Sequence, residues 1–409
     1  MKILIVSPVF WPESFRVNDM AEVLVQEGHD VEVLAGHPNY PEGTFFKGYH
    51  WFGPWKETRQ GVRVLRFPQI PRGRGTAIRL ILQYLSYVLA GMLRLILRLR
   101  WDWDAILVFQ VTPVTAAWPA LLAGKLSRAG TVIWVQDLWP EVVEDTGMVR
   151  NAELISLLRK LSDRTYKAFD RVLTQSLSFK NALQARGIPA ERLECVYNWA
   201  EPDYLTITPE PQGASPWAPG FTVLFAGNLG RAQGLPTIIQ AAEKLKNIDG
   251  LQWVFLGDGA MRPWLEKEIL RLELGSKVFL LGRHPIESMP RFYSHSDVLL
   301  LSLGKGSAFE RTLPGKLQGY LAAGRPVLAI ADGEVMEVLE SAQAGRSVPA
   351  ESPDLLAEAV MGMMALSREE RLQMGASGRA FYQTHCARQV GIGKIEAALR
   401  SVARGSHPR

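Results

Sequence analysis

Short apolar runs alternate with segments of helical spacing along this sequence, and this alternation restricts the possible folds more than any other feature. The apolar run at 2–6 is followed by apolar residues at helical spacing from 17 to 28, and a second apolar run comes at 31–34. A strand, a helix and a strand in this order form a βαβ unit, whose two strands are parallel. The alternation continues to residue 197 and predicts a doubly wound α/β domain.

A proline-rich stretch divides the chain into two parts. Residues 199–220 hold five prolines and show no periodicity, and proline both removes a backbone donor and blocks a helix. Beyond them the alternation restarts, and a chain of 409 residues is long enough for two domains. We therefore predict an α/β protein with two doubly wound, Rossmann-like domains facing a cleft. The predicted bounds are 1–198 and 221–385 for the domains, 199–220 for a linker, and 386–409 for a C-terminal helix that packs back on the first domain.

Several classes of protein are excluded by what the sequence lacks. Only two cysteines occur, which excludes a disulfide framework and a four-cysteine zinc site and favours a reducing compartment. No GxGxxG dinucleotide motif, P-loop or HExxH motif is present, so neither a cofactor nor a metal ion is expected. The N-terminus lacks the long apolar stretch and the cleavage site of a signal peptide, so we expect a cytoplasmic protein.

One region carries the positive charge of the chain. Residues 58–101 contain no acidic residue and nine arginines, at positions 59, 63, 66, 72, 74, 79, 94, 98 and 100. The net charge of this segment is +9 and that of the whole chain is +5, so the remaining residues have a net charge of −4. Such a basic region favours an anionic partner, which could be membrane lipid or nucleic acid.

The same region contains a predicted helix at 77–99. Its residues 80–93 are a run of 14 without charge, shorter than the roughly 20 residues of a membrane-spanning helix. With arginines at both ends, this run is typical of a helix that lies on an anionic lipid surface. A buried core helix with basic ends is the alternative. Leu, Ile and Tyr at helical spacing favour the membrane over nucleic acid, which would require interleaved aromatic residues for base stacking.

Ligands of parallel sheets bind beyond the carboxyl ends of the strands, so the residues that follow each predicted strand are candidates. The glycine-rich turn 227–234 opens a helix, where backbone N–H groups attract an anion and Arg231 adds a charge; a plain tight turn is the alternative. Lys316 lies in the first turn of another helix, where the helix dipole disfavours a cation unless an anion lies between them. Asp137 and Glu141 follow a strand beside two tryptophans, a combination suited to binding a sugar, although capping of the next helix would also explain them.

Taken together, the motifs resemble those of a known family. They are FWPE at 10–13, GHDVEVLAGHPNYPEG at 28–43, VQDLWPE at 135–141, VYNW at 196–199, GNLGRAQGL at 227–235, GDG at 257–259 and LPGKLQGYLAAGRPVLAIADGE at 313–334. Over essentially its whole length the chain resembles the family-four retaining glycosyltransferases of the two-Rossmann (GT-B) fold. More narrowly, it resembles their WbuB/WcaI-like branch, which builds bacterial surface polysaccharides.

The resemblance implies a set of site residues. For binding of the nucleotide sugar donor they are Gly227, Asn228, Gln233, Gly257, Asp258, Arg283, His284, Arg311, Pro314 and Gly315. The implied catalytic residues are Asp137, Glu141, Glu310, Arg231 and Lys316, and the implied acceptor-side residues are Pro12, Glu13, Asn39 and Tyr40. The chain departs from the Glu-x7-Glu pair of the family, because Arg311 and Gly319 occupy those positions.

The resemblance also implies an activity. We expect transfer of an N-acetylated amino or deoxyamino sugar, with retention, from a UDP-linked donor and without a metal ion or cofactor. The expected acceptor is lipid-linked or a glycan in O-antigen, capsule or exopolysaccharide synthesis, and the expected location is peripheral, on the inner leaflet of the cytoplasmic membrane. No nucleic-acid partner is expected. The alternatives are a UDP-sugar epimerase or a phosphorylase of the same fold, and a polyanion-binding module that uses residues 58–101.

Overall fold

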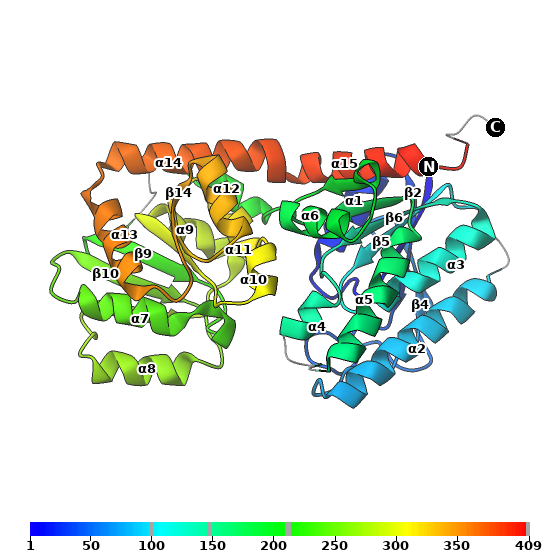
Figure 1. Ribbon diagram of the computed structural model, residues 1–409, viewed down its shortest axis with the longest axis horizontal. Coiled ribbons are helices and arrows are strands. Elements are labelled where there is room, and N and C mark those ends of the chain that lie inside the picture. The colour runs from blue at the N-terminus through cyan, green and yellow to red at the C-terminus, as the bar shows by residue number, and fades with distance from the viewer. Residues whose placement is uncertain (99–100, 146–148, 150, 209–213, 406–409) are drawn as a thin grey trace. The chain divides into compact units, whose positions relative to one another are not determined.

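The computed structural model describes residues 1–98, 101–145, 149, 151–208 and 214–405 of the chain. It divides into two compact units, Met1–Tyr197 together with Gly391–Arg409, and Asn198–Val390 (Figure 1). Each unit is built on its own α/β sheet, which confirms the predicted fold class. The stretch predicted as a linker, 199–220, falls within the second unit, and its residues 209–213 lie outside the described residues.

In its described part, the first unit contains a sheet of eight strands in the order β3-β4-β2-β1-β5-β6-β7-β8. The strands are β1 (Lys2–Ser7), β2 (Asp30–Gly36), β3 (Lys56–Arg59), β4 (Val62–Phe67), β5 (Ala105–Gln110), β6 (Gly130–Val135), β7 (Arg171–Thr174) and β8 (Leu193–Cys195). All neighbours are parallel except β3 and β4, which form an antiparallel pair at one edge. The sequence did not predict β3, because this edge strand reads KETR and has no apolar run.

Helices cover both faces of this sheet. They are α1 (Arg16–Gln26), α2 (Ala77–Ile96), α3 (Trp118–Ser127), α4 (Glu141–Asp145), α5 (Ala152–Lys167), α6 (Leu177–Ala185) and α15 (Arg388–Val402). Leu4 and Val6 of β1 point into a core to which α2, α3 and α5 contribute. Ile3 and Ile5 point to the other face and are equally buried, as expected for a parallel strand at the centre of a sheet.

In the part of the second unit that the structure describes, six parallel strands follow the order β11-β10-β9-β12-β13-β14. They are β9 (Phe221–Ala226), β10 (Leu251–Leu256), β11 (Val278–Gly282), β12 (Val298–Ser302), β13 (Val327–Ile330) and β14 (Gly345–Val348). The helices are α7 (Leu235–Lys244), α8 (Arg262–Arg271), α9 (Met289–Ser294), α10 (Ser307–Arg311), α11 (Gly315–Ala323), α12 (Glu334–Ala342), α13 (Pro353–Ala365) and α14 (Arg368–Phe381). The strand order reverses beside β1 in one sheet and beside β9 in the other, and ligands of such sheets bind at these reversal points.

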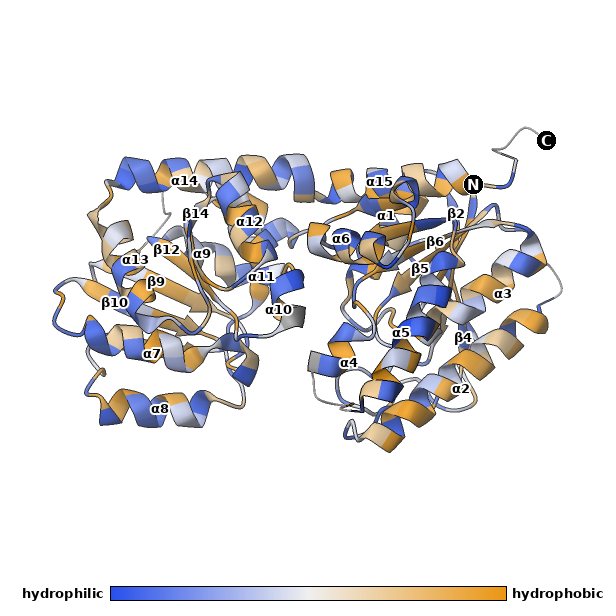
Figure 2. Ribbon diagram, in the orientation of Figure 1, coloured by the Kyte–Doolittle hydropathy of each residue, from blue (hydrophilic) through white to orange (hydrophobic). Residues whose placement is uncertain are grey.

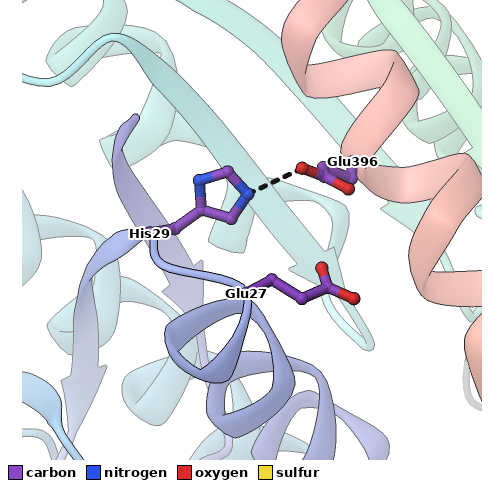
Figure 3. Close-up of side chains that lie close together, drawn as sticks. All are labelled: Glu27, His29 and Glu396. Atoms are coloured by element: carbon purple, nitrogen blue, oxygen red, sulfur yellow. Dashed lines mark hydrogen bonds and ion pairs between the residues drawn. The ribbon is translucent and has the colours of Figure 1, made fainter.

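The C-terminal helix α15 is attached to the first unit by a polar cluster (Figure 3). His29 Nε2 lies 2.8 Å from Glu396 Oε1, and Arg400 Nε donates to the same oxygen at 3.0 Å. Burial alone would raise the pKa of Glu396, but the hydrogen bonds from Arg400 and His29 hold it below its usual value. One potential metal-ligand atom from each of Glu27, His29 and Glu396 lies within 4.8 Å of the other two. Oε1 of Glu396, however, already contacts His29 and Arg400.

Helix α2 has one buried face and one exposed face. Leu80, Tyr87, Val88, Gly91 and Leu95 pack into the core. The other face exposes a row of aliphatic side chains, Ile78, Ile81, Leu82, Leu85, Leu89, Leu93 and Ile96. Much of α2 is coloured as hydrophobic in Figure 2. Among the described residues, α2 is the one helix that length and composition would allow to cross a membrane. It ends at Ile96, before the predicted end at residue 99, which lies outside the described residues.

The basic segment is largely neutralised within the first unit. Four of its eight described arginines form ion pairs with carboxylates from outside the segment, and Arg100 lies outside the described residues. The pairs are Arg59 with Glu22 at 3.8 Å, Arg63 with Asp30 at 2.8 Å, Arg66 with Glu57 at 2.6 Å, and Arg98 with Glu32. The count of nine arginines therefore overstates the charge available to an anionic partner.

Replacing Arg98 by glutamine is expected to destabilise the first unit by about 2–3 kcal/mol, because the buried carboxylate of Glu32 loses its ion-pair partner. Glu32 then keeps only the hydrogen bond from Trp103 Nε1 at 3.0 Å among the described contacts. Arg94→Gln is the matched control, since Arg94 reaches only two backbone carbonyl oxygens, at 3.3 and 3.4 Å. Its expected loss is below about 0.5 kcal/mol. Urea unfolding measures both variants, and equal losses would contradict this role of the Arg98–Glu32 pair.

Candidate functional site

A pocket of about 340 Å³ lies at the carboxyl edge of the first sheet, and we call it the first-unit pocket. Residues that follow five different strands form its walls: Val9, Asn39, Gln69, Thr112 and Asp137. Helix α2 closes one side with Leu80, Tyr84 and Tyr87. Four residues that the sequence predicted line this pocket, namely Glu13, Asn39, Tyr40 and Asp137. The pocket thus lies where parallel sheets bind their ligands.

Glu13 holds the loop that carries Asn39 and Tyr40. Its Oε1 accepts hydrogen bonds from the backbone N–H groups of Asn39 at 2.9 Å and Tyr40 at 2.8 Å, and its Oε2 accepts from Phe10 N at 3.1 Å. Burial raises the pKa of Glu13, and these backbone hydrogen bonds partly offset the rise. Asn39 Oδ1 in turn accepts from the backbone N–H of Arg72 at 3.0 Å. With hydrogen bonds to both of its oxygens, Glu13 positions the pocket wall.

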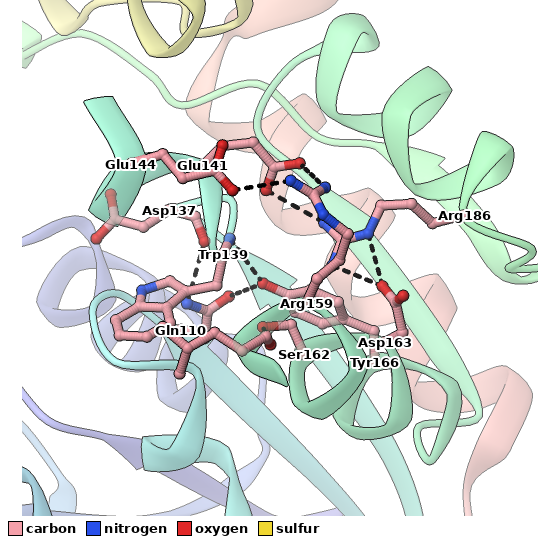
Figure 4. A network of polar contacts seen from close by, with 11 residues as sticks. Gln110, Asp137, Trp139, Glu141, Glu144, Arg159, Ser162, Asp163, Tyr166 and Arg186 are labelled. Carbon is pink, nitrogen blue, oxygen red and sulfur yellow. Dashed lines mark hydrogen bonds and ion pairs between the residues drawn. The ribbon is translucent and has the colours of Figure 1, made fainter. Parts of the chain in front are cut away.

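Asp137 keeps one carboxylate oxygen available to the pocket. Its Oδ2 accepts hydrogen bonds from the backbone N–H and the hydroxyl of Thr112, at 2.8 and 2.9 Å. Gln110 Nε2 donates to the Asp137 carbonyl at 3.2 Å, which fixes the backbone (Figure 4). Burial raises the pKa of Asp137, and the hydrogen bonds from Thr112 oppose the rise. Within the described part of the chain, Oδ1 has no hydrogen-bond partner, so it can accept one from a ligand hydroxyl.

The structure places Glu141 in an ion-pair network and not in the pocket lining (Figure 4). Arg159 Nη1 contacts its Oε1 at 2.8 Å, and Arg186 Nη1 contacts its Oε2 at 3.4 Å. Glu141 opens α4, so its side chain turns toward the arginine on α5 and the one that follows α6. It therefore ties three helices together. Pro12, the remaining predicted acceptor-side residue, is not among the lining residues either.

A hollow of about 320 Å³ lies at the carboxyl edge of the second sheet, and we call it the second-unit hollow. Its lining follows β9, β10 and β11 and consists of Gly227, Asn228, Leu256, Gly257, Asp258, Arg283, His284 and Met289. Six of these eight were predicted as donor-binding residues. Two glycines allow the loops to approach closely, since a Cβ on Gly257 would lie 1.9 Å from Gly227 O, and a Cβ on Gly227 would lie 2.3 Å from Lys316 Cε.

Lys316 carries a half-buried amine directly beside this hollow. Its Nζ donates to Gln233 Oε1 at 2.5 Å and lies 4.0 Å from the centroid of the Phe225 ring. Burial lowers the pKa of Lys316 from its usual value of 10.5 to about 7. No described carboxylate pairs with it, so an anion that binds next to Gly227 would meet an amine that can take up a full charge.

Five further predicted residues are not among the lining residues of the hollow: Arg231, Glu310, Arg311, Pro314 and Gly315. Arg231 begins an exposed 3-10 turn, and the side chain of Glu310 is exposed to solvent. Pro314 caps α11, whose first residue is Gly315. A Cβ at Gly315 would meet nothing within 4 Å, so the position has room for a side chain.

The departure from the Glu-x7-Glu pattern has a packing reason. A Cβ on Gly319 would lie 3.0 Å from Cε2 of Tyr204, closer than nearly all real contacts of this kind. The Tyr204 ring is held in place by stacking on Tyr293, with 5.3 Å between the ring centroids. A glutamate at 319 could therefore enter only if Tyr204 moved.

The lining residues that the sequence analysis did not predict include Arg72, Tyr84, Thr112 and Met289. Thr112 comes two residues after β5, so the rule that found Asp137 after β6 could also have found it. Arg72 follows β4, but its charge was attributed to the basic segment as a whole. Tyr84 lies within α2, where nothing in the sequence separates it from the neighbouring apolar positions.

Comparisons with known proteins agree with this geometry. A glycosyl transferase 4-like domain matches residues 14–199, and a domain of the glycosyl transferases group 1 matches residues 216–381. The putative colanic acid biosynthesis glycosyl transferase WcaI of Escherichia coli is 26% identical over 357 residues, covering 79% of this chain and 82% of that protein. The probable glycosyltransferase WbjE of Pseudomonas aeruginosa is 25% identical over 279 residues, covering 66% and 68%. The solved structure of HepE from Anabaena in complex with UDP covers 98% of this chain and 100% of its own, with a TM-score of 0.69 and 16% identity.

The two α/β sheets, the cavities at their carboxyl edges and these matches define a glycosyltransferase with a GT-B-like fold. The chain contains a glycosyl transferase 4-like domain followed by a domain of the glycosyl transferases group 1. The sequence resemblance to the family-four enzymes of the WcaI-like branch is thereby confirmed.

Binding of UDP is expected to weaken as the pH rises above 7. The free protein has a Lys316 pKa of about 7, so the neutral amine dominates at higher pH, whereas a bound diphosphate favours the protonated form. The dissociation constant should rise by up to about tenfold per pH unit between pH 7.5 and 9, with one proton taken up per UDP bound. Isothermal titration calorimetry at several pH values measures both quantities.

The control for this prediction is Lys316→Met, which removes the titrating amine and keeps an unbranched side chain. The variant should bind UDP weakly, and its dissociation constant should not rise with pH in this way. A slope that persisted in the variant would assign the pH dependence to another group.

Proposed function

We propose that the protein is a retaining glycosyltransferase that moves a sugar from UDP to a lipid-linked or glycan acceptor during assembly of a bacterial surface polysaccharide. The second-unit hollow binds the donor, and the first-unit pocket binds the acceptor. The observation that carries the proposal is Lys316, a half-buried amine with no described carboxylate partner beside a glycine-lined hollow. The UDP bound to HepE supports the choice of nucleotide, and the colanic acid role in the name of WcaI supports the pathway class. The class of sugar, an N-acetylated amino or deoxyamino sugar, is taken from the family resemblance.

In the proposed reaction, the bond between the anomeric carbon and the diphosphate oxygen breaks while the bond to the acceptor oxygen forms on the same face. UDP leaves with the bonding electron pair, and one of its phosphate oxygens takes the proton of the acceptor hydroxyl. The charge of Lys316 stabilises the negative charge that grows on the diphosphate. Asp137 Oδ1 accepts a hydrogen bond from the acceptor and orients it. This scheme requires neither a protein nucleophile nor a metal ion.

The proposal includes a location, peripheral attachment to the inner leaflet of the cytoplasmic membrane. Its support is the exposed aliphatic face of α2, with Arg74 and Arg79 near one end and Arg94 near the other. Apolar burial contributes about 25 cal/mol per Å², and each basic residue near an anionic surface contributes about 1 kcal/mol. The face is narrow and its opposite side is packed on the core, which suits a helix lying on a bilayer surface.

A transfer assay tests the activity. With a panel of UDP-, GDP- and dTDP-linked sugars and lipid-linked acceptors in detergent, we expect product from a UDP-sugar, with the anomeric configuration retained as read by NMR. Turnover should continue in excess EDTA. Lys316→Ala should lower kcat by about 10²–10³-fold, as removal of other preorganised charge stabilisers does. Three results would contradict the proposed activity. The first is inversion of the anomeric configuration, and the second is loss of activity on chelation that Mg²⁺ or Mn²⁺ restores. The third is conversion of the UDP-sugar to an epimer without an acceptor.

Co-sedimentation with vesicles that contain anionic lipid tests the location. The wild type is expected to pellet, and the triple variant Ile78→Gln, Leu85→Gln, Leu89→Gln is expected to stay in the supernatant. Ile78 is 74% exposed and Leu89 68% exposed, so these changes remove the apolar face without opening the core. Leu270→Gln on α8 is the matched control at 79% exposure, and it should pellet like the wild type.

Two outcomes would contradict the proposed attachment to the membrane. A wild type that stays in solution with anionic vesicles at low salt refutes the attachment. A soluble dimer that the triple variant dissociates would show that a second copy covers this face of α2.

A further inference from the structure

A short turn between β2 and β3 presents two aromatic side chains to solvent. His50 N donates to Gly53 O at 3.0 Å, and Gly53 N donates to His50 O at 3.2 Å. Trp51 and Phe52 occupy the two central positions of this closed turn, and Trp51 packs edge-on against Phe45 with 5.5 Å between the ring centroids. Phe52 is 82% exposed, more than any other large apolar side chain among the described residues. The turn is therefore held in one shape while its apolar tip remains uncovered.

Exposed aromatic side chains are confined to this part of the chain. Among the described residues, those exposed by 38% or more all lie within the first 55 positions and are Trp11, Tyr40, Trp51, Phe52 and Trp55. The Phe45 ring, which Trp51 contacts, lies 5.9 Å from the ring of His37, and the Trp55 ring lies 6.0 Å from the same histidine. We call Trp51, Phe52 and Trp55 the aromatic patch. Contiguous exposed apolar surface of this kind indicates a partner.

A groove of about 700 Å³ lies beside the aromatic patch, between β3 and the end of α2. Four cations and two carboxylates line it: Lys56, Arg63, Arg94, Arg98, Glu32 and Glu57. Each of the two carboxylates is ion-paired with an arginine, and Arg63 pairs with Asp30. Lys56 and Arg94 have no carboxylate partner in the described part of the chain. The lining thus has two positive charges in excess, and the groove suits an anionic partner.

Arg94 joins the groove to the aromatic patch and to the exposed face of α2. Its Nη2 donates to the backbone carbonyl of Trp55 at 3.4 Å, and Lys56 directly follows Trp55 at the start of β3. At the end of α2, Leu93 is 56% exposed and Leu97 is 66% exposed, and Leu97 also lines the groove. Aromatic, cationic and aliphatic side chains therefore adjoin one another on the first unit.

We propose that the aromatic patch enters the surface of an anionic bilayer while Lys56 and Arg94 contact the phosphates of its lipids. The inference rests on the proposed membrane location and adds a second contact, separate from the exposed row of α2. Tryptophan side chains favour the boundary between head groups and hydrocarbon, and cations near the surface are attracted to anionic lipid. A helix that alone touches a bilayer can rotate about its own axis, whereas a second contact from the loop before β3 gives the first unit one orientation on the membrane.

Vesicle binding of the full chain tests the contribution of each group. We expect Phe52→Ser to weaken binding to vesicles of phosphatidylcholine and phosphatidylglycerol by about five- to tenfold, because less apolar area leaves water on binding. Lys56→Gln combined with Arg94→Gln should weaken binding to these vesicles at least about tenfold and leave binding to pure phosphatidylcholine unchanged. The matched controls are Leu270→Ser and Lys267→Gln, two exposed positions on α8, and both should bind like the wild type.

A probe at position 52 reports directly whether the turn enters the bilayer. Both native cysteines, Cys195 and Cys386, are buried, so an environment-sensitive fluorophore can be attached selectively to Phe52→Cys. Anionic vesicles should shift its emission to shorter wavelength, and lipids brominated on their acyl chains should quench it. The same fluorophore on Leu270→Cys, at a position that is 79% exposed, should show neither change.

The outcomes separate this inference from the proposed function. If the wild type binds anionic vesicles while the probe at position 52 shows no change and Phe52→Ser binds equally well, this inference alone is overturned. A soluble dimer that Phe52→Ser dissociates would also overturn it, because a second copy would then cover the patch. A wild type that binds no vesicles refutes the membrane location together with this inference. Transfer in detergent should proceed at the wild-type rate in Phe52→Ser and in the double variant, since none of these residues lines either cavity.

Discussion

Both sheets are parallel through their centres, and this constraint brings together most of the residues that line the two cavities. All strands of a parallel sheet end at the same edge, so the loops that follow them meet there whatever their separation in sequence. In the first unit the constraint brings Glu13 and Asp137, more than a hundred residues apart, into the lining of one pocket. In the second unit it brings the turn after β9 against the turn after β10, so closely that Gly257 has no room for a side chain.

The three predicted site carboxylates of the first unit, Glu13, Asp137 and Glu141, have different roles in the structure. Glu13 binds three backbone N–H groups, and Glu141 binds two arginines. A buried carboxylate without such partners would be unstable, which explains why most of them are occupied. Asp137 differs because Thr112 occupies only one of its oxygens. Among these carboxylates, Asp137 Oδ1 is therefore the group best placed to bind a ligand in the first-unit pocket.

Apolar runs predicted the central strands well, and positions after strands predicted much of both cavities. The apolar runs predicted at 2–6 and 31–34 lie within β1 and β2, because a strand that is buried on both faces requires apolar residues along most of its length. The edge strand β3 escaped prediction because it is polar and half exposed. The separation of Asp137 from Glu141 also could not be predicted, since it depends on where Arg159 and Arg186 lie after folding. The same holds for Arg63 and Arg98, whose carboxylate partners come from a distant strand.

The close fit of Tyr204 against Gly319 limits the routes by which this chain can evolve. A side chain added at 319 meets the tyrosine ring, and a smaller residue at 204 leaves a gap beside the glycine. Neither single replacement is neutral, so descendants would have to exchange both residues in step, and the two positions should co-vary among relatives. A chimera that carries the family's glutamate at 319 without a smaller residue at 204 would therefore acquire a steric clash with Tyr204.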